Sequence, residues 1–180
     1  MSVNPIQYLA QAELIHSDVA VNQAIFAIAT QLNRDYGGES PIVLCVMGGA
    51  VFFAGQLLPK LQFPLELDYV QASRYHGGTE GKTLQWMVKP KDNISNRKVL
   101  ILDDILDEGV TLSEIVAQCS LLGASEVKTA VLVEKNLIKS KPIKADYVGL
   151  YVPDRYVFGC GMDVFGWWRN LPAIYALNNA

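Results

Sequence analysis

Short apolar runs alternate along the chain with stretches in which apolar residues recur every three or four positions. Three of these runs are rich in Val, Ile and Leu and are bounded by polar residues or glycine: 41–47, 98–102 and 128–133. Runs of this composition are typical of strands buried in a parallel sheet. The segment 68–75 alternates in polarity and also predicts a strand.

The stretches between the runs predict amphipathic helices. Ser17 or Asp18 is expected to cap the first helix, which ends near Gly37. Its apolar face consists of five residues at helical spacing: Val21, Ala24, Ile25, Ile28 and Leu32. A second apolar stripe extends over 112–122 and is closed by Gly123, just past its end.

The order of these elements predicts the fold class. A third helix is expected over about 51–60, and strand–helix–strand repetition predicts an α/β fold with a parallel sheet covered on both faces. Two strand-like pieces, 147–152 and 156–159, follow residue 140. No repeat or linker divides the sequence, so we expect a single domain, 1–180.

Composition and charge exclude several classes of protein. The net charge of −3 argues against a general nucleic-acid binder, because such proteins present a basic surface. The first residues lack the pattern of a signal peptide, and no apolar run is long enough to span a membrane. Three widely spaced cysteines fit neither a disulfide framework nor a metal cluster. We therefore expect a cytoplasmic protein with no nucleic-acid or membrane partner.

The segment 99–112 carries the candidate chemistry. Its strand is expected to end in Asp103 and Asp104, and a turn with Gly109 then leads into a helix. Ligands bind at the carboxyl ends of strands in open α/β sheets, and a loop before a helix suits a phosphate. A helix cap would explain one carboxylate. Three within five residues, Asp107 included, favour a site for sugar hydroxyls or magnesium beside a phosphate.

This segment resembles the phosphoribosyl-pyrophosphate signature of the type I phosphoribosyltransferases: a hydrophobic strand, two acidic residues, two apolar residues, then Asp-Thr/Ser-Gly-x-Thr. The resemblance covers roughly 18–171, and its details are similar to the hypoxanthine-guanine branch. The segment 132–135 (LVEK) is similar to the strand that ends in that branch's base-recognising lysine. The segment 152–159 (VPDRYVFG), with Asp163 and Arg169 after it, is similar to its hood.

The resemblance implies both a fold and an activity. The implied fold is a doubly wound α/β core with a parallel sheet of about five strands and a small hood from both chain ends, about 1–17 and 145–180. The implied enzyme is a purine-salvage transferase that joins hypoxanthine or guanine to the ribose 5-phosphate of phosphoribosyl pyrophosphate. It would release IMP or GMP and pyrophosphate. Mg²⁺ is the implied cofactor, and a homodimer or homotetramer the implied assembly.

On the sugar-phosphate side, the resemblance implies that Asp103 and Asp104 bind the ribose hydroxyls and magnesium. Asp107 is the implied general base, which takes the N7 proton as N9 attacks. The implied contacts to phosphoribosyl pyrophosphate are Asp103, Asp104, Asp107, Glu108, Gly109, Val110, Thr111, Gly48, Gly49 and Arg169. The family usually has Thr or Ser in place of Glu108. It usually has Lys or Arg in place of Gly48, although members commonly use only backbone there.

On the purine side, the resemblance implies that Lys135 donates to O6 and Tyr156 stacks on the ring. The backbone near Val157 and Asp163 would contact the 2-position, and Asp163 would join the acidic pair as a metal ligand. Ser73, Arg74 and Tyr75 resemble the family's mobile loop, with the arginine inserted. Closure of that loop would exclude water from a cationic sugar.

Three other interpretations stay open at this point. Glu108 is compatible with a non-catalytic phosphoribosyl-pyrophosphate sensor, although the chain carries no basic patch or DNA-binding appendage. The acidic pair is also found in phosphoacceptor receiver domains, but there it lies on the first strand, and roughly a hundred residues precede it here. The glycine-rich segment 76–83 is one glycine short of a nucleotide-binding P-loop, and a strand-like segment follows it instead of a helix.

Overall fold

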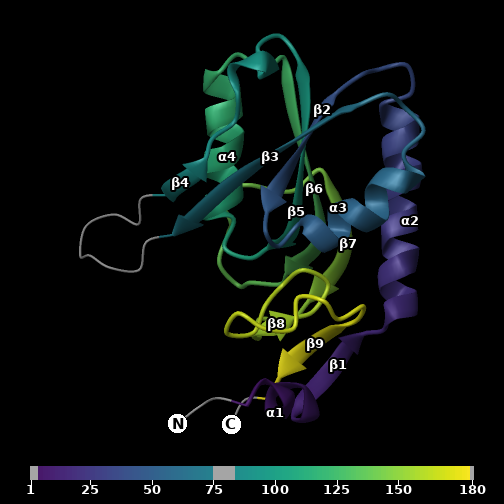
Figure 1. The fold of residues 1–180 in the computed structure, drawn as a ribbon, viewed down its shortest axis with the longest axis vertical. Coiled ribbons are helices and arrows are strands. Elements are labelled where there is room, and N and C mark those ends of the chain that lie inside the picture. Colours follow the sequence, from purple (N-terminus) through teal and green to yellow (C-terminus); the bar gives the residue numbers. More distant parts are fainter. Residues whose placement is uncertain (1–3, 75–83, 179–180) are drawn as a thin grey trace.

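The computed structural model describes residues 4–74 and 84–178, and six strands of these ranges form a central sheet (Figure 1). Their order is β4 (Leu84–Val88), β3 (Glu66–Arg74), β2 (Ile42–Met47), β5 (Lys98–Leu106), β6 (Glu126–Lys135) and β7 (Tyr147–Val152). The last five are mutually parallel, and β4 pairs antiparallel with β3. The predicted α/β fold with about five parallel strands is confirmed.

Helices cover both faces of this sheet. α2 (Asp18–Asp35) and α3 (Val51–Leu57) pack on one face, and α4 (Val110–Leu121) packs on the other (Figure 1). The predicted apolar stripe of α2 is buried against the sheet, and that of α4 is buried at Leu112, Ile115 and Cys119. The strands between these helices are therefore shielded from water on both faces, as their continuous apolar sequences require.

Local sequence sets where the helices begin and end. Ser17 caps α2, because its hydroxyl accepts a hydrogen bond from the N–H of Ala20 at 3.3 Å. The third predicted helix, 51–60, is α3 followed by the 3₁₀ turn η1 (Leu58–Lys60), where Pro59 has no N–H to continue the α-helix. A second 3₁₀ turn is η2 (Asp92–Ile94). None of the helices in the described ranges has the length and hydropathy that crossing a membrane requires.

β5 is the central strand, and it is longer than the sequence predicted. Its residues 99–102 are fully buried between β2 and β6. Pairing with β2 stops at Cys45–Leu102, but pairing with β6 continues to Leu106–Glu134. The sequence predicted that the strand ends at Asp103 and Asp104, whereas β5 continues past them to Leu106, and the two carboxylates lie where β5 has lost one neighbour.

A small antiparallel sheet joins the two ends of the chain beside the large sheet (Figure 1). Its order is β1 (Ala12–His16), β9 (Ile174–Leu177) and β8 (Val157–Phe158), and α1 (Pro5–Ala10) precedes β1. The hood was expected to begin near residue 145, but β7 is paired with β6 in the large sheet. The C-terminal contribution to the small sheet therefore begins after Val152, because residues 147–152 continue the parallel order. The assignment of 1–180 to one domain stays a prediction.

Candidate active site

Two adjacent carboxylates lie at the end of β5. Asp103 and Asp104 are each 8% exposed, and the N–H of Ile105 donates to Asp104 Oδ1 at 2.9 Å. Burial, and then the charge of Asp104, raise the pKa of the Asp103 carboxyl well above its usual range. Burial also raises the pKa of Asp104, and the nearby Arg169 guanidinium opposes that shift. Such a pair favours a bound cation, which would stabilise the ionised form of both groups.

A cavity of ≈ 260 Å³ lies between this pair and the start of α4. The turn 107–109 and Thr111 line one side of it. Gly109 is the N-cap residue of α4, with φ 81°, a left-handed conformation that a glycine adopts without steric strain. Gly109 has no side chain to cap this helix end, and Thr111 in the first turn of α4 lines the cavity. The geometry suits a phosphate group.

Two glycines line the opposite side of the same cavity. Gly48 and Gly49 follow β2, on the side where β5 has lost its neighbour. A side chain at Gly49 would overlap the carboxylate of Asp104, so only glycine lets the backbone approach so closely. A side chain at Gly48 would meet no protein atom within 4 Å. The turn therefore leaves room for a side chain at Gly48 but none at Gly49.

A second cavity, of ≈ 230 Å³, adjoins the first and shares Asp104, Asp107 and Arg169 with it. Its other lining residues are Lys135, Tyr156, Val157, Met162 and Asp163. Lys135 is the last residue of β6, and its ammonium donates to Asp107 Oδ2 at 2.8 Å. The side chain of Lys135 is 12% exposed and that of Asp107 45%, so the pair presents a donor and an acceptor side by side to the cavity.

One aromatic side chain lines this second cavity, and two others lie behind it. Tyr156 lines it directly and stacks on Phe165, with 5.7 Å between ring centroids and 19° between the planes. Tyr8 from α1 lies 5.2 Å beyond, on Phe165. Phe165 does not line the cavity, so it supports the Tyr156 ring from outside the cavity. Sequence reasoning missed Phe165 and Tyr8, because no periodic pattern marks them.

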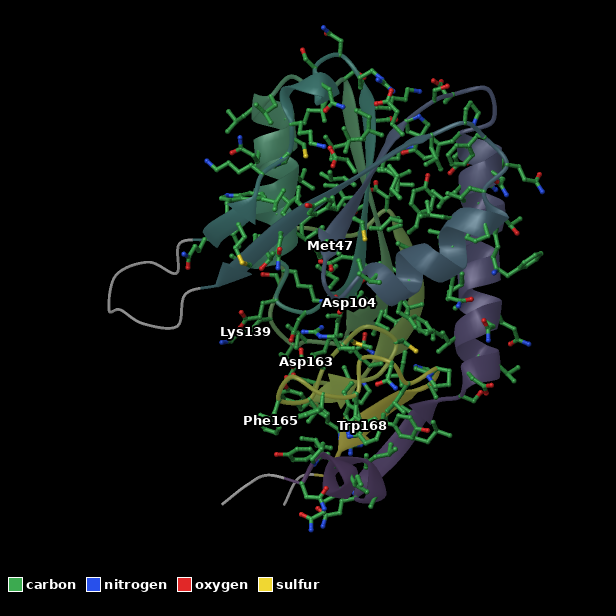
Figure 2. All side chains as sticks on the ribbon, viewed as in Figure 1. Met47, Asp104, Lys139, Asp163, Phe165 and Trp168 are labelled. Carbon is green, nitrogen blue, oxygen red and sulfur yellow. The ribbon has the colours of Figure 1, made fainter. Side chains whose placement is uncertain are left out.

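Arg169 and Asp163 close the site from the side of the small sheet. The Arg169 guanidinium contacts Asp163 Oδ1 at 2.7 Å and donates to the carbonyl of Gly161 at 2.6 Å. The other carboxylate oxygen of Asp163 accepts from the N–H of Gly166 at 2.7 Å. Asp163 lies near Asp104, between the large sheet and the loop that carries Phe165 (Figure 2). Asp163 thus has an arginine partner in this structure, and its expected role as a metal ligand stays a prediction.

The structure places most of the predicted site residues around the two adjoining cavities. They come from the ends of β2, β5 and β6, the start of α4 and the loop after β8. Val110 is the first residue of α4 and lines neither cavity. Of the predicted mobile loop, Ser73 and Arg74 end β3, while their side chains and the whole of Tyr75 lie outside the described residues. The glycine-rich segment 76–83 lies outside them as well, and β4 follows, which fits the predicted strand better than a P-loop helix.

Comparisons with known proteins agree with this geometry. A sequence model of the phosphoribosyl transferase domain matches residues 11–164. The chain is 32% identical over 168 residues to the hypoxanthine-guanine-xanthine phosphoribosyltransferase of Tritrichomonas foetus, covering 93% of this chain and 92% of the relative. It is 36% identical over 151 residues to the hypoxanthine-guanine phosphoribosyltransferase of Streptococcus thermophilus, covering 83% and 84%. A crystal structure of a hypoxanthine phosphoribosyltransferase from Staphylococcus aureus superposes with a TM-score of 0.88 at 29% identity, covering 98% of this chain and 97% of that one.

Proposed function

Because the chain belongs to the phosphoribosyl transferase domain family, we propose that it transfers the ribose 5-phosphate of phosphoribosyl pyrophosphate to N9 of a 6-oxopurine. The products are IMP or GMP and pyrophosphate. One observation carries the proposal: a cavity beside the start of α4 and a cavity lined by Tyr156 adjoin and share Asp104, Asp107 and Arg169. A sugar phosphate in the first and a flat base in the second would meet at these shared residues.

The first cavity suits phosphoribosyl pyrophosphate with Mg²⁺. The turn 107–111 and the N-terminus of α4 bind the 5-phosphate, and Gly48, Gly49 and Arg169 bind the pyrophosphate. The described residues contain no cluster of three or more metal-binding side chains. The carboxylates of Asp103 and Asp104 line this cavity, and Mg²⁺ usually takes one or two carboxylates together with substrate phosphates and waters. Asp103 and Asp104 are the residues that would bind it, and when bound it neutralises charge on the leaving pyrophosphate.

The second cavity suits a 6-oxopurine edge. Hypoxanthine and guanine present an acceptor at O6 and, in one tautomer, a donor at N7, and both atoms lie on the same edge of the base. Lys135 offers a donor and Asp107 an acceptor, 2.8 Å apart, so the base would replace their mutual contact with one contact to each. Asp107 would then take the N7 proton as N9 attacks the anomeric carbon. Tyr156 stacks on the ring.

The remaining parts of the proposal concern shielding and assembly. Ser73, Arg74 and Tyr75 would close over the site, because a cationic sugar exposed to water would be hydrolysed. The chain would act as a homodimer or homotetramer in the cytoplasm. The position of Ser73 and Arg74 at the end of β3, beside β2 and its Gly48–Gly49 turn, supports the first of these points.

The test is a direct assay with purified protein, phosphoribosyl pyrophosphate and Mg²⁺. Hypoxanthine, guanine, xanthine and adenine are supplied separately, and nucleotide formation is followed by ultraviolet absorbance and chromatography. We expect IMP or GMP with one pyrophosphate released per nucleotide, little or no AMP, and no product in excess chelator. Absence of nucleotide from every 6-oxopurine, with the protein folded, would reject the function. Asp104→Asn is the matched negative control.

A further inference from the structure

Lys141 lies in the loop between β6 and β7, yet its side chain is only 9% exposed. Its ammonium donates to the carbonyl of Lys135 at 2.6 Å, to the carbonyl of Leu106 at 3.0 Å and to Glu134 Oε1 at 3.0 Å. An ammonium has three donors, and each of them has an acceptor here. Lysine is seldom buried without such partners, so these contacts fix the side chain in one place.

The two carbonyls belong to the last residues of two neighbouring strands. The ladder between β5 and β6 ends at the pair Leu106–Glu134. Beyond it, β5 turns into the phosphate loop and β6 turns toward β7. The Lys141 ammonium bridges the strand ends at the point where their own ladder hydrogen bonds stop.

This bridge lies next to the pair that faces the purine cavity. Asp107 directly follows Leu106, and Lys135 itself carries one of the bridged carbonyls. The backbones from which the Asp107 and Lys135 side chains extend are thus held together through one ammonium. This backbone bridge adds to the Lys135–Asp107 contact, which joins the same two strand ends through their side chains.

We propose that Lys141 is a positioning residue that sets the spacing of Asp107 and Lys135, and through it the preference for a purine with an acceptor at position 6. The inference rests on the function proposed above. Lys141 does not line the purine cavity, so it acts through the two strand ends. A catalytic pair displaced by about 1 Å can lose about 10²-fold in rate. The spacing therefore controls both the rate and the choice of base.

The experiment compares Lys141→Met with Lys141→Arg and with Lys144→Met, a change of an exposed lysine in the same loop. For each variant, kcat/KM is measured with hypoxanthine and with adenine, together with KM for phosphoribosyl pyrophosphate and the unfolding temperature. We expect Lys141→Met to lower kcat/KM for hypoxanthine by about 10²-fold and to lower it much less for adenine. Lys141→Arg, which keeps the charge and several donors, should recover most of the loss, and Lys144→Met should match the wild type.

Two kinetic results would overturn the proposal: an unchanged kcat/KM in Lys141→Met, or equal losses with both bases, which would mean that Lys141 only stabilises the fold. If Lys141→Met does not fold, Lys141→Gln, whose uncharged amide still donates, is measured in its place with the same expected direction. A crystal structure of the variant gives a result that does not depend on activity. Loss of the Lys135–Asp107 contact supports the proposal even if the wild type makes no nucleotide, and retention of that contact refutes it.

Discussion

Gly49→Ala should weaken the use of phosphoribosyl pyrophosphate far more than Gly48→Ala, although both glycines line the same cavity. A methyl group at Gly49 would lie 2.8 Å from Asp104 Oδ1 and closer still to the rest of that carboxylate. A methyl group at Gly48 would meet no protein atom within 4 Å. The Gly49 backbone is tightly packed, because its carbonyl lies so close to Gly161 that a side chain there would overlap it. The carboxylate of Asp104 therefore has to move.

The size of the effect follows from what Asp104 loses. Rotation of its carboxylate breaks the hydrogen bond from the N–H of Ile105, 2.9 Å long. A hydrogen bond to a charged group contributes about 1.5–3 kcal/mol. Since about 1.4 kcal/mol corresponds to a tenfold change in affinity, KM for phosphoribosyl pyrophosphate should rise about 10- to 100-fold in Gly49→Ala. Gly48→Ala should stay near the wild type, because its methyl group would meet no protein atom within 4 Å.

Initial rates at saturating hypoxanthine and Mg²⁺ measure this difference, and thermal unfolding is followed in parallel. Unfolding temperatures that agree between the two variants would assign the change in KM to the site itself. The reasoning fails if the two KM values agree within about twofold. The overlap at Gly49 would then have changed the binding free energy by at most about 0.4 kcal/mol.

Three further predictions concern the carboxylates and the lysine. Asp107→Asn should lower kcat by about 10²–10⁴-fold with a modest change in KM, and a nearly wild-type single-turnover rate would exclude it as the general base. Lys135→Ala should erode discrimination against adenine, because an ammonium can only donate; the ratio of kcat/KM values for hypoxanthine and adenine measures this. Asp103 has a raised pKa when folded, so its ionisation destabilises the fold as pH rises above the ordinary carboxyl range. Without Mg²⁺, Asp103→Asn should therefore raise the unfolding temperature at about pH 8 and much less at about pH 4, and an equal change at both would contradict the shift.

The parallel core and its helices could be predicted from the sequence because burial on both faces leaves a direct pattern. The end of β5 could not. Periodicity marks Asp103 as the first polar residue after an apolar run, but it does not show that β2 stops pairing with β5 at Leu102 while β6 continues to pair with it as far as Leu106. Likewise, Val148 and Leu150 resemble residues of any short strand, so the pattern gives no sign that β7 pairs with β6 rather than with the chain ends.

Sequence motifs also fail to mark residues that support the site by contacting the residues that line it. Lys141 occurs in a polar loop and looks like a solvated charge in the sequence, yet it is buried against two strand ends. Phe165 stands among exposed aromatic residues, and its contact with Tyr156 joins positions that share no helix or strand. Motifs record the groups that touch a ligand, whereas these supporting contacts depend on how separate segments pack, which spacing along the chain does not encode.

The charged groups of the site differ in how well other protein groups compensate their charge when no substrate is bound. This difference explains the order in which the ligands should bind. Lys135 and Asp107 pair with each other, so a base gains only if it offers an acceptor to one and a donor to the other. Adenine, with an amino group at position 6, would leave the ammonium without an acceptor. The charges of Asp103 and Asp104 are less well compensated. Burial raises the pKa of both carboxyls, although the Arg169 guanidinium opposes the shift at Asp104. The acidic pair therefore gains most from the first cation that arrives, and in the proposed reaction Mg²⁺ carried by phosphoribosyl pyrophosphate would supply one before the purine has to break the Lys135–Asp107 contact.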